Sequence, residues 1–302
     1  EALIKRVGAE CIPFVSLAGT VNMAGGQPVS MANLKALREL CNVYGIPVYL
    51  DATRMAENCF FIQEREEGYQ DKTIAEILRE FCSYTDGAWM SSKKDNLVNI
   101  GGWLAVNDKE LFDKLRNLVV VYEGLHTYGG MAGRDMEALA IGISEGVQDD
   151  HIRSRIEQVR YLGNLLINWN IPIVRPVGGH AIFLDARSFY SHLPQDKFPA
   201  QTLAAELYLD SGVRSMERGI VSAGRDPETG EHRYPSLELT RLAIPRRVYT
   251  QAHMDVVSEA IRAVYKARKE TKGLKMVYEP NYLRFFQARF EKIEVDPIVR
   301  TR

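Results

Sequence analysis

Two segments of the chain carry side chains that are suited to covalent catalysis. Asp51 follows the apolar run at 46–50, and the segment SSKKD at 91–95 follows a second apolar run. If both runs are strands of one parallel sheet, a carboxylate and a lysine project over the same edge. This combination suits pyridoxal phosphate, because a lysine holds its aldehyde as a Schiff base while a carboxylate keeps its pyridine nitrogen protonated.

Each of these residues also has an ordinary structural interpretation. Asp51 fits a turn, and Lys93 and Lys94 fit a solvated pair, roles that are more common when spacing is the only information. Arg54 lies three residues after Asp51, within reach of a cofactor oxygen. Asn22 ends the opening strand, where its amide can meet a ring oxygen, although turn and surface positions are commoner for both types. Spacing by itself leaves the choice open.

Three arginines in the last third of the sequence lie within or beside apolar stretches, and these are Arg214, Arg218 and Arg241. A buried guanidinium suits a carboxylate, because two parallel hydrogen bonds fix position and angle together. Structural salt bridges are the more common role, and Glu217 is an available partner. The aromatic pair at 285–286 fits either a pocket wall or core packing.

Short apolar strands alternate with helical segments in the first half of the chain. The predicted strands are 12–17, 46–50, 87–90 and 102–106, and the predicted helices are 30–45 and 74–84. Ser30 is suited to cap the start of the first helix, and Gly45 to end it. This alternation predicts a parallel α/β sheet, in which ligands bind at the carboxyl ends of the strands.

The second half of the chain has a different pattern. A helical stretch at 135–168 is expected to bridge two lobes. After Pro172, a strand, a helix, a strand and a long helix are predicted at 181–184, at 200–209, at 237–244 and after Thr250. Mixed runs of this kind indicate a smaller α+β domain. We therefore expect a large cofactor-binding domain at 1–169 and a small domain at 170–302.

Composition excludes several classes of protein. With 302 residues, 46% hydrophobic and 25% charged, the chain can bury one large core or two ordinary ones. With a formal net charge of −1, the chain has no excess of basic residues that would bind the phosphate groups of nucleic acid or an anionic membrane. The sequence has neither an apolar run of membrane-spanning length nor a signal peptide. We expect a cytoplasmic protein that acts on a small molecule or binds another protein.

The four cysteines and six histidines show no metal-binding pattern. A metal site needs ligand pairs at close spacing, and none is present in the sequence. Cys11, Cys41, Cys59 and Cys82 are widely spaced and have apolar neighbours, so we expect four buried thiols.

Seven short motifs together resemble the tyrosine phenol-lyase branch of the β-eliminating lyases, in which tryptophanase is the close relative. The motifs are TVNMAGGQPVSM at 20–31, DATR at 51–54, SSKKD at 91–95, VNIGG at 98–102, YGGMAGRD at 128–135, RSMERG at 214–219 and LRFF at 283–286. The likeness extends from the first residues to about residue 293.

The resemblance implies pyridoxal-phosphate fold type I, an aspartate aminotransferase-like α/β fold with a mostly parallel sheet and a smaller α+β carboxy-terminal domain. It implies β-elimination of L-tyrosine to phenol, pyruvate and ammonia by a homotetramer that uses pyridoxal 5′-phosphate and an activating potassium ion. It also implies an amino-terminal segment, absent from this sequence, that supplies the phosphate loop and a general-acid tyrosine. The chain is therefore expected to be a fragment, or to receive that segment as a separate polypeptide.

The same resemblance implies roles for individual residues. Lys94 matches the Schiff-base lysine, and Asp51 matches the partner of the pyridine nitrogen. Arg241 matches the arginine that holds the substrate α-carboxylate, and Arg218 the one that engages the phenolic hydroxyl. The implied cofactor-binding residues are Asn22, Asp51, Arg54, Ser91, Lys93 and Lys94. The other implied site residues are Met216, Phe285 and Phe286 of the substrate pocket, Tyr128 near the phosphate, and Asn99 as a backbone ligand of potassium.

Two alternatives stay open. Tryptophanase shares the cofactor residues but has an apolar residue in place of Arg218. Indole has no hydroxyl, so a guanidinium buried against it would have unpaired hydrogen-bond donors, which would cost about 1–3 kcal/mol of binding free energy. Trp103, Leu125 and His126 depart from the phenol-lyase pattern, and Ser92 replaces the usual glycine. The other alternative is a catalytically silent assembly subunit that binds no cofactor.

Overall fold

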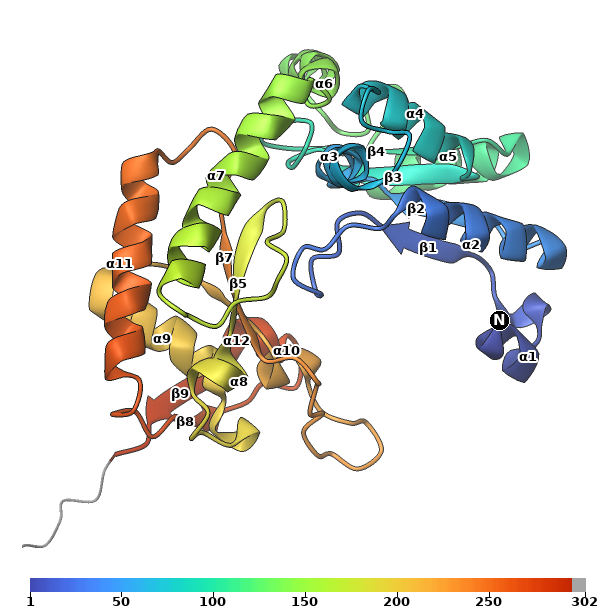
Figure 1. Cartoon of the computed structure of the whole chain (residues 1–302). Helices are drawn as coiled ribbons and strands as arrows, with labels where there is room; N and C mark the ends of the chain where they lie inside the picture. Colours follow the sequence, from blue (N-terminus) through green and yellow to red (C-terminus); the bar gives the residue numbers. More distant parts are fainter. Residues whose placement is uncertain (295–302) are drawn as a thin grey trace, which may run out of the picture. The chain divides into compact units, whose positions relative to one another are not determined.

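The computed structural model describes residues 1–294, and the chain forms two compact units (Figure 1). The first unit is Glu1–Glu157, and the second follows it. The division falls inside helix α7 (Asp149–Asn168), within the stretch that is expected to bridge two lobes. The boundary predicted at 169/170 lies just beyond the end of this helix. Residues 295–302 of the predicted small domain lie outside the described residues.

Unit 1 contains a four-stranded sheet with the order β1-β2-β3-β4. The strands are β1 (Val15–Ala18), β2 (Val48–Asp51), β3 (Gly87–Ser91) and β4 (Gly102–Val106). The first three are parallel, and β4 is antiparallel to β3, which confirms the mostly parallel sheet. Because Ala18 pairs with Asp51 and Asp51 pairs with Trp89, the chain leaves β1, β2 and β3 at one edge.

Helices connect the parallel strands, as a parallel ladder requires. The connecting helices are α2 (Met31–Tyr44), between β1 and β2, and α3 (Met55–Arg65) and α4 (Ile74–Ser83), between β2 and β3. Unit 1 also contains α1 (Ala2–Val7) and the 3₁₀ turn η1 (Ala9–Cys11) before β1, and α5 (Lys109–Tyr122) and α6 (Gly133–Glu145) after β4. The predicted caps of α2 are confirmed. The Ser30 hydroxyl accepts the Asn33 N–H at 3.0 Å, and Gly45 ends the helix with a left-handed φ of 64°. Across residues 1–294, none of the helices combines the length and apolar character needed to cross a bilayer.

The helical stretch predicted at 135–168 consists of two helices rather than one. The helix is interrupted at Gly146, between α6 and α7. The Asp95 carbonyl lies so close to Gly146 that a Cβ there would overlap it, and Gly142 approaches the Asn96 carbonyl in the same way. The end of α6 therefore packs directly on the backbone of the segment that follows β3, a contact that periodicity does not reveal.

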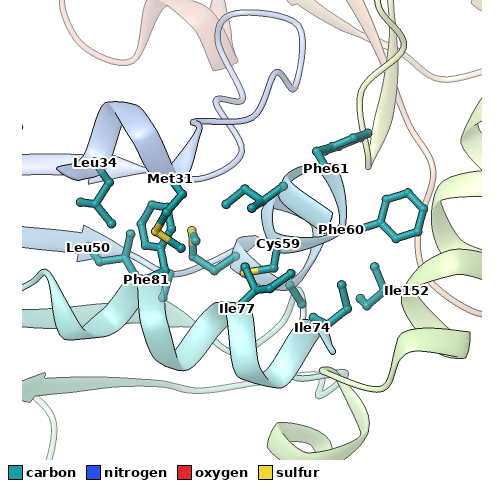
Figure 2. Packing of buried hydrophobic residues seen from close by; sticks show 14 of the residues in the cluster. Met31, Leu34, Leu50, Cys59, Phe60, Phe61, Ile74, Ile77, Phe81 and Ile152 are labelled. Carbon is teal, nitrogen blue, oxygen red and sulfur yellow. The ribbon is translucent and has the colours of Figure 1, made fainter. Parts of the chain in front are cut away.

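The core of unit 1 forms around α3, which is buried along eight consecutive residues from Met55 to Ile62. A helix buried all round requires partners on every side. These partners include Met31, Leu34, Leu50, Ile74, Ile77, Phe81 and Ile152 (Figure 2). The buried Glu57 of α3 pairs with the buried Arg155 at 3.6 Å, so the charges in this core are compensated.

Unit 2 is built on a three-stranded antiparallel sheet with the order β5-β7-β6. Predicted elements are confirmed in β5 (Ala181–Asp185), α9 (Pro199–Ser211), β7 (Leu239–Ala243) and α11 (Gln251–Ala267). Several shorter elements were not predicted: α8 (Ala186–Phe189), η2 (Gln195–Lys197), β6 (Met216–Arg218), α10 (Ile220–Ala223), β8 (Leu274–Tyr278), α12 (Arg284–Gln287) and β9 (Arg289–Lys292). Segments of three to five residues contain too little periodicity to be recognised.

The prediction that all four cysteines are buried is wrong for two of them. Cys41 and Cys59 are buried, whereas Cys11 and Cys82 are exposed, and all four are free thiols. Cys82 follows the buried Phe81 near the end of α4, and the step of about 100° per residue turns it towards solvent. Cys11 lies in the turn η1, outside the sheet.

Phe81 and Cys82 form a matched pair for testing this packing. Phe81 is 0% exposed, so Phe81→Ala creates a cavity and is expected to lower the free energy of unfolding by about 3–5 kcal/mol. Cys82→Ala shortens an exposed side chain and should change that free energy by less than about 0.5 kcal/mol. Chemical denaturation of the full-length protein measures both changes. Equal effects would contradict the place of Phe81 in the core.

Candidate active site

The carboxylate and lysine that the sequence singles out lie on segments that leave adjacent strands at one edge of the unit 1 sheet. Asp51 is the last residue of β2, and Lys94 lies three residues beyond Ser91, the last residue of β3. The Thr53 hydroxyl accepts the Ser91 N–H at 3.2 Å, and the Thr53 N–H donates to Asp51 Oδ1 at 3.1 Å. Thr53, which sequence reasoning missed, therefore ties the two strand ends together.

The turn that carries Lys94 is anchored by its neighbour. Asp95 is buried, and its Oδ2 accepts N–H groups from the first turn of α3, the shorter bond being 2.9 Å from Ala56. A carboxylate at this position satisfies helix N–H groups that have no partner within the helix. The Lys94 backbone is thus held in place, while the Lys94 side chain is half-buried and that of Lys93 is exposed.

Two departures from the phenol-lyase pattern lie beside this turn. The Trp103 indole N–H donates to Asn96 Oδ1 at 3.3 Å, so this tryptophan also anchors the segment after Lys94. Ser92 is 0% exposed, and its hydroxyl has no hydrogen-bond partner among residues 1–294. A buried hydroxyl without a partner costs about 1–3 kcal/mol, which fits a site whose ligand brings polar atoms.

Asn22 and Arg54 lie on the segments that continue from β1 and β2 at the same edge. Asn22 is half-buried in the loop after β1, and Arg54 is the half-buried N-cap residue of α3. Asn58, fully buried in α3, holds the Asn22 loop by exchanging two hydrogen bonds of 2.8 Å with the backbone of Val29. The predicted cofactor-contacting residues therefore both depend on α3 for their position, Arg54 as its N-cap and Asn22 through the loop that Asn58 holds.

Two predicted site residues lie away from the strand ends. Tyr128 is exposed in the turn between α5 and α6, where its N–H donates to the Leu125 carbonyl at 3.1 Å. Asn99 is exposed in the link between the Lys94 turn and β4. Their roles near the phosphate and at potassium stay predictions.

In unit 2, the sheet brings three predicted substrate-binding residues to one face. Met216 of β6 pairs with Arg241 of β7, and Arg218 pairs with Leu239. Paired residues share a face, as do residues two apart along a strand, so Met216, Arg218 and Arg241 project to the same side. The guanidinium carbon of Arg218 lies 4.9 Å from the centroid of the Phe285 ring.

The aromatic pair is only partly buried. The centroids of Phe285 and Phe286 are 5.0 Å apart with an interplanar angle of 76°, and Phe286 is 74% exposed. Arg214, the third arginine singled out by the sequence, is exposed in the segment before β6. It does not share the half-buried surroundings of Arg218.

Arg218 is a half-buried charge that forms no salt bridge within residues 1–294. Its Nε is buried and has no hydrogen-bond partner in that part of the chain, and burial lowers the pKa of the guanidinium. The salt bridge with Glu217 that the sequence allows is not formed there, because neighbouring residues of a strand point to opposite faces. An acceptor oxygen from a ligand would satisfy this group.

Two buried glutamates, missed by sequence reasoning, brace the end of β6. Glu217 accepts the Val221 N–H at 3.0 Å, and Glu238 accepts the Ile220 N–H at 2.8 Å, so together they satisfy the start of α10. Burial, aided by the negative charge of Glu217, raises the pKa of Glu238 to about 7. The sequence signal for Glu238 is its place inside the apolar run SLELTRLAI.

The raised pKa of Glu238 makes stability fall as the pH rises. Between 4.5 and about 7, Glu238 is protonated in the folded state but ionised in the unfolded state, so the folded state binds more protons. We expect Glu238→Gln to raise the midpoint of thermal unfolding, relative to wild type, more at about pH 8 than at about pH 5. The exposed Glu231→Gln is the matched control. An effect of Glu238→Gln that is equal at both pH values would contradict the assignment.

The sequence matches the family model of the β-eliminating lyases over residues 1–260. Among curated relatives, the tyrosine phenol-lyase of Nostoc punctiforme is 69% identical over 289 residues, and that of Symbiobacterium thermophilum is 64% identical over 293 residues. These matches cover 96% and 97% of this chain but 62% and 64% of the relatives. The chain thus spans less than two thirds of their length.

Among solved structures, a serine palmitoyltransferase from S. paucimobilis with bound PLP is similar to this chain, with a TM-score of 0.55 at 16% identity. The similarity covers 89% of this chain and 58% of that enzyme. It confirms the predicted fold class, fold type I. The family model of the β-eliminating lyases matches most of the length of this chain, and the chain therefore belongs to that family.

Proposed function

We propose that the complete protein catalyses the pyridoxal-phosphate-dependent β-elimination of L-tyrosine to phenol, pyruvate and ammonia. One observation carries the proposal: Asp51 and the Lys94 turn leave adjacent parallel strands at one edge, where Thr53 ties them together. The identity of 69% and 64% to two tyrosine phenol-lyases supports the choice of substrate.

The strand ends of unit 1 suit pyridoxal phosphate. When bound, this cofactor supplies an electron sink for removal of the substrate α-proton. Lys94 would hold the cofactor and then move the α-proton, while Asp51 would keep the ring nitrogen protonated. The donors available for the ring and phosphate oxygens are Asn22, Arg54, Ser91 and Lys93. The buried hydroxyl of Ser92, which has no partner among residues 1–294, supports a polar ligand here.

The face formed by β6 and β7 suits a substrate with a carboxylate and a phenolic hydroxyl. Arg241 would hold the α-carboxylate through paired hydrogen bonds. Arg218 would donate to the phenolic oxygen, which supplies the acceptor that its buried Nε lacks within the described chain. That bond would favour the keto form of the ring, from which phenol can leave. Met216, Phe285 and Phe286 would pack around the ring.

The family likeness extends the proposal to features beyond these two sets of residues. We infer a cytoplasmic homotetramer and an activating potassium ion that the Asn99 carbonyl helps to bind. Tyr128 would lie beside the cofactor phosphate. Because the chain spans 62–64% of its relatives, the activity is proposed for the complete protein.

Elimination of indole from tryptophan is the second candidate, and Arg218 argues against it. Indole has no hydroxyl, so the donors of the half-buried guanidinium would have no acceptor on the ring, which would cost about 1–3 kcal/mol of binding free energy. A catalytically silent subunit is the candidate of another class, and it predicts that the complete protein binds no cofactor.

Lys94→Ala is expected to abolish the visible absorption band of a lysine-bound cofactor, because the amine that forms the bond is removed. Absorption spectra of the full-length protein, reconstituted with pyridoxal phosphate, measure this band. The exposed Lys109→Ala is the control and should keep it. A band that persists in Lys94→Ala would remove Lys94 from the role, and its absence in wild type would favour the silent subunit.

Arg218→Ile is expected to lower kcat/KM for phenol release from tyrosine by about 10- to 100-fold, the effect of losing charged hydrogen bonds of about 1.5–3 kcal/mol. Release from S-alkylcysteines should fall by less than about threefold, because their leaving group needs no ring tautomer. Arg214→Ile is the matched control, since Arg214 is exposed. Equal losses with both substrates would show that Arg218 does not act on the phenol ring.

A further inference from the structure

The aromatic pair of the proposed substrate pocket lies on a single helical turn. In α12, the N–H groups of Phe286 and Gln287 both donate to the Leu283 carbonyl, at 2.9 and 3.2 Å. One turn of helix is not stable by itself. Phe286 is 74% exposed, so burial of its side chain contributes little. The other side chains of α12 must therefore hold it, namely Phe285, which packs against the buried cluster around Phe198 and Ile220, and Arg284.

Arg284, the first residue of α12, makes such contacts. Its side chain is 9% exposed, and its Nη1 lies 3.1 Å from Oε1 of Glu279. Its Nη2 lies 2.9 Å from Nδ1 of His232 and 3.5 Å from the carbonyl of Ile220. One largely buried guanidinium thus joins α12 to three other segments of unit 2.

The partners of Arg284 set the charge of this cluster. Glu279 also accepts from Arg225, through Nε at 2.8 Å and Nη2 at 2.7 Å. Because an arginine can only donate, His232 accepts at Nδ1 and is neutral in this arrangement. The pKa of His232 is lowered, first by burial and then by the positive charges of Arg284 and Arg225. The other groups that face His232 are Glu279, Asp196 and the rings of Phe198 and Tyr234.

We propose that Arg284 is a positioning residue that holds Phe285 against Arg218. Glu279 and a neutral His232 hold Arg284 in turn. Phe285 follows Arg284 directly in the chain, and its ring centroid lies 4.9 Å from the guanidinium carbon of Arg218. If α12 loosens, Arg218 loses this aromatic neighbour and the substrate ring loses one wall. The inference rests on the proposed function, because it assumes that Arg218 meets a phenolic oxygen.

The first test measures α12 without reference to catalysis. In the full-length protein, Arg284→Gln is expected to speed hydrogen exchange of the amides at 286–288 by at least about tenfold, while amides of α11 stay within about twofold. Arg233→Gln is the matched control, because Arg233 is exposed and adjoins His232 in the chain. Unchanged exchange at 286–288 would overturn the proposal. Faster exchange throughout unit 2 would overturn it as well, since the proposed effect is local.

His232 provides a milder test that does not remove the arginine. As the pH falls through the lowered pKa of His232, protonation removes the acceptor nitrogen and places another positive charge beside Arg284. Exchange at 286–288, corrected for its intrinsic pH dependence, is expected to quicken in wild type over that titration. His232→Gln keeps an acceptor oxygen but does not titrate, so its corrected exchange should stay constant. If both proteins respond alike, His232 has no part in holding α12.

Kinetics distinguishes this proposal from the proposed function. Arg284→Gln should lower kcat/KM for tyrosine by about tenfold and for S-alkylcysteines by less than about twofold. Arg284→Lys keeps the positive charge, so its kcat/KM for tyrosine should lie between the values of wild type and Arg284→Gln. Equal losses with both substrates would overturn the positioning role. If wild type eliminates neither substrate, the proposed function fails, while the exchange measurements still decide whether Arg284 holds α12.

Discussion

The parallel register of β1, β2 and β3 is the constraint on which the candidate site depends. Ala18, Asp51 and Trp89 lie side by side in the ladder, so the chain leaves all three strands at one edge. A parallel pair can be joined only by a crossover, which is why α2, α3 and α4 separate these strands in the sequence. The polar residues that follow these three strands then lie together, because the parallel hydrogen bonding places the carboxyl ends of β1, β2 and β3 at that edge.

Several polar side chains at this edge bind backbone groups of other segments. Thr53 accepts a backbone N–H from β3, Asp95 accepts two from α3, and Asn58 binds the loop after β1. Buried backbone N–H groups need partners, and each one left unpaired costs about 1–3 kcal/mol. Satisfying them fixes the segments that carry Lys94 and Asn22, so the same hydrogen bonds serve both stability and the geometry of the site.

Strand alternation determines the charge distribution in unit 2. Glu217 and Arg218 are adjacent in the sequence, yet they point to opposite faces of the sheet. The Glu217 carboxylate is occupied by N–H groups at the start of α10, and Glu238 completes that cap. Arg218 therefore keeps a buried donor for which the described residues offer no acceptor. A fold that buries two carboxylates beside one turn of helix thereby leaves the arginine available to a ligand.

By itself, the sequence determined most of the long elements, the caps of α2 and the membership of a family, because hydrophobic period, capping residues and motif text are all local properties. It did not predict α5, or α3, whose eight consecutive buried residues leave no amphipathic period to recognise. Tertiary structure alone decided which segments meet. Asp95 caps α3 from a position 39 residues further along the chain, and Arg284 reaches His232 across 52 residues. Tertiary packing also broke the helix predicted at 135–168 at Gly146, against the Asp95 backbone. A carboxylate can cap any helix and a guanidinium can bind any acceptor, so local spacing contains no record of the partner that each one meets.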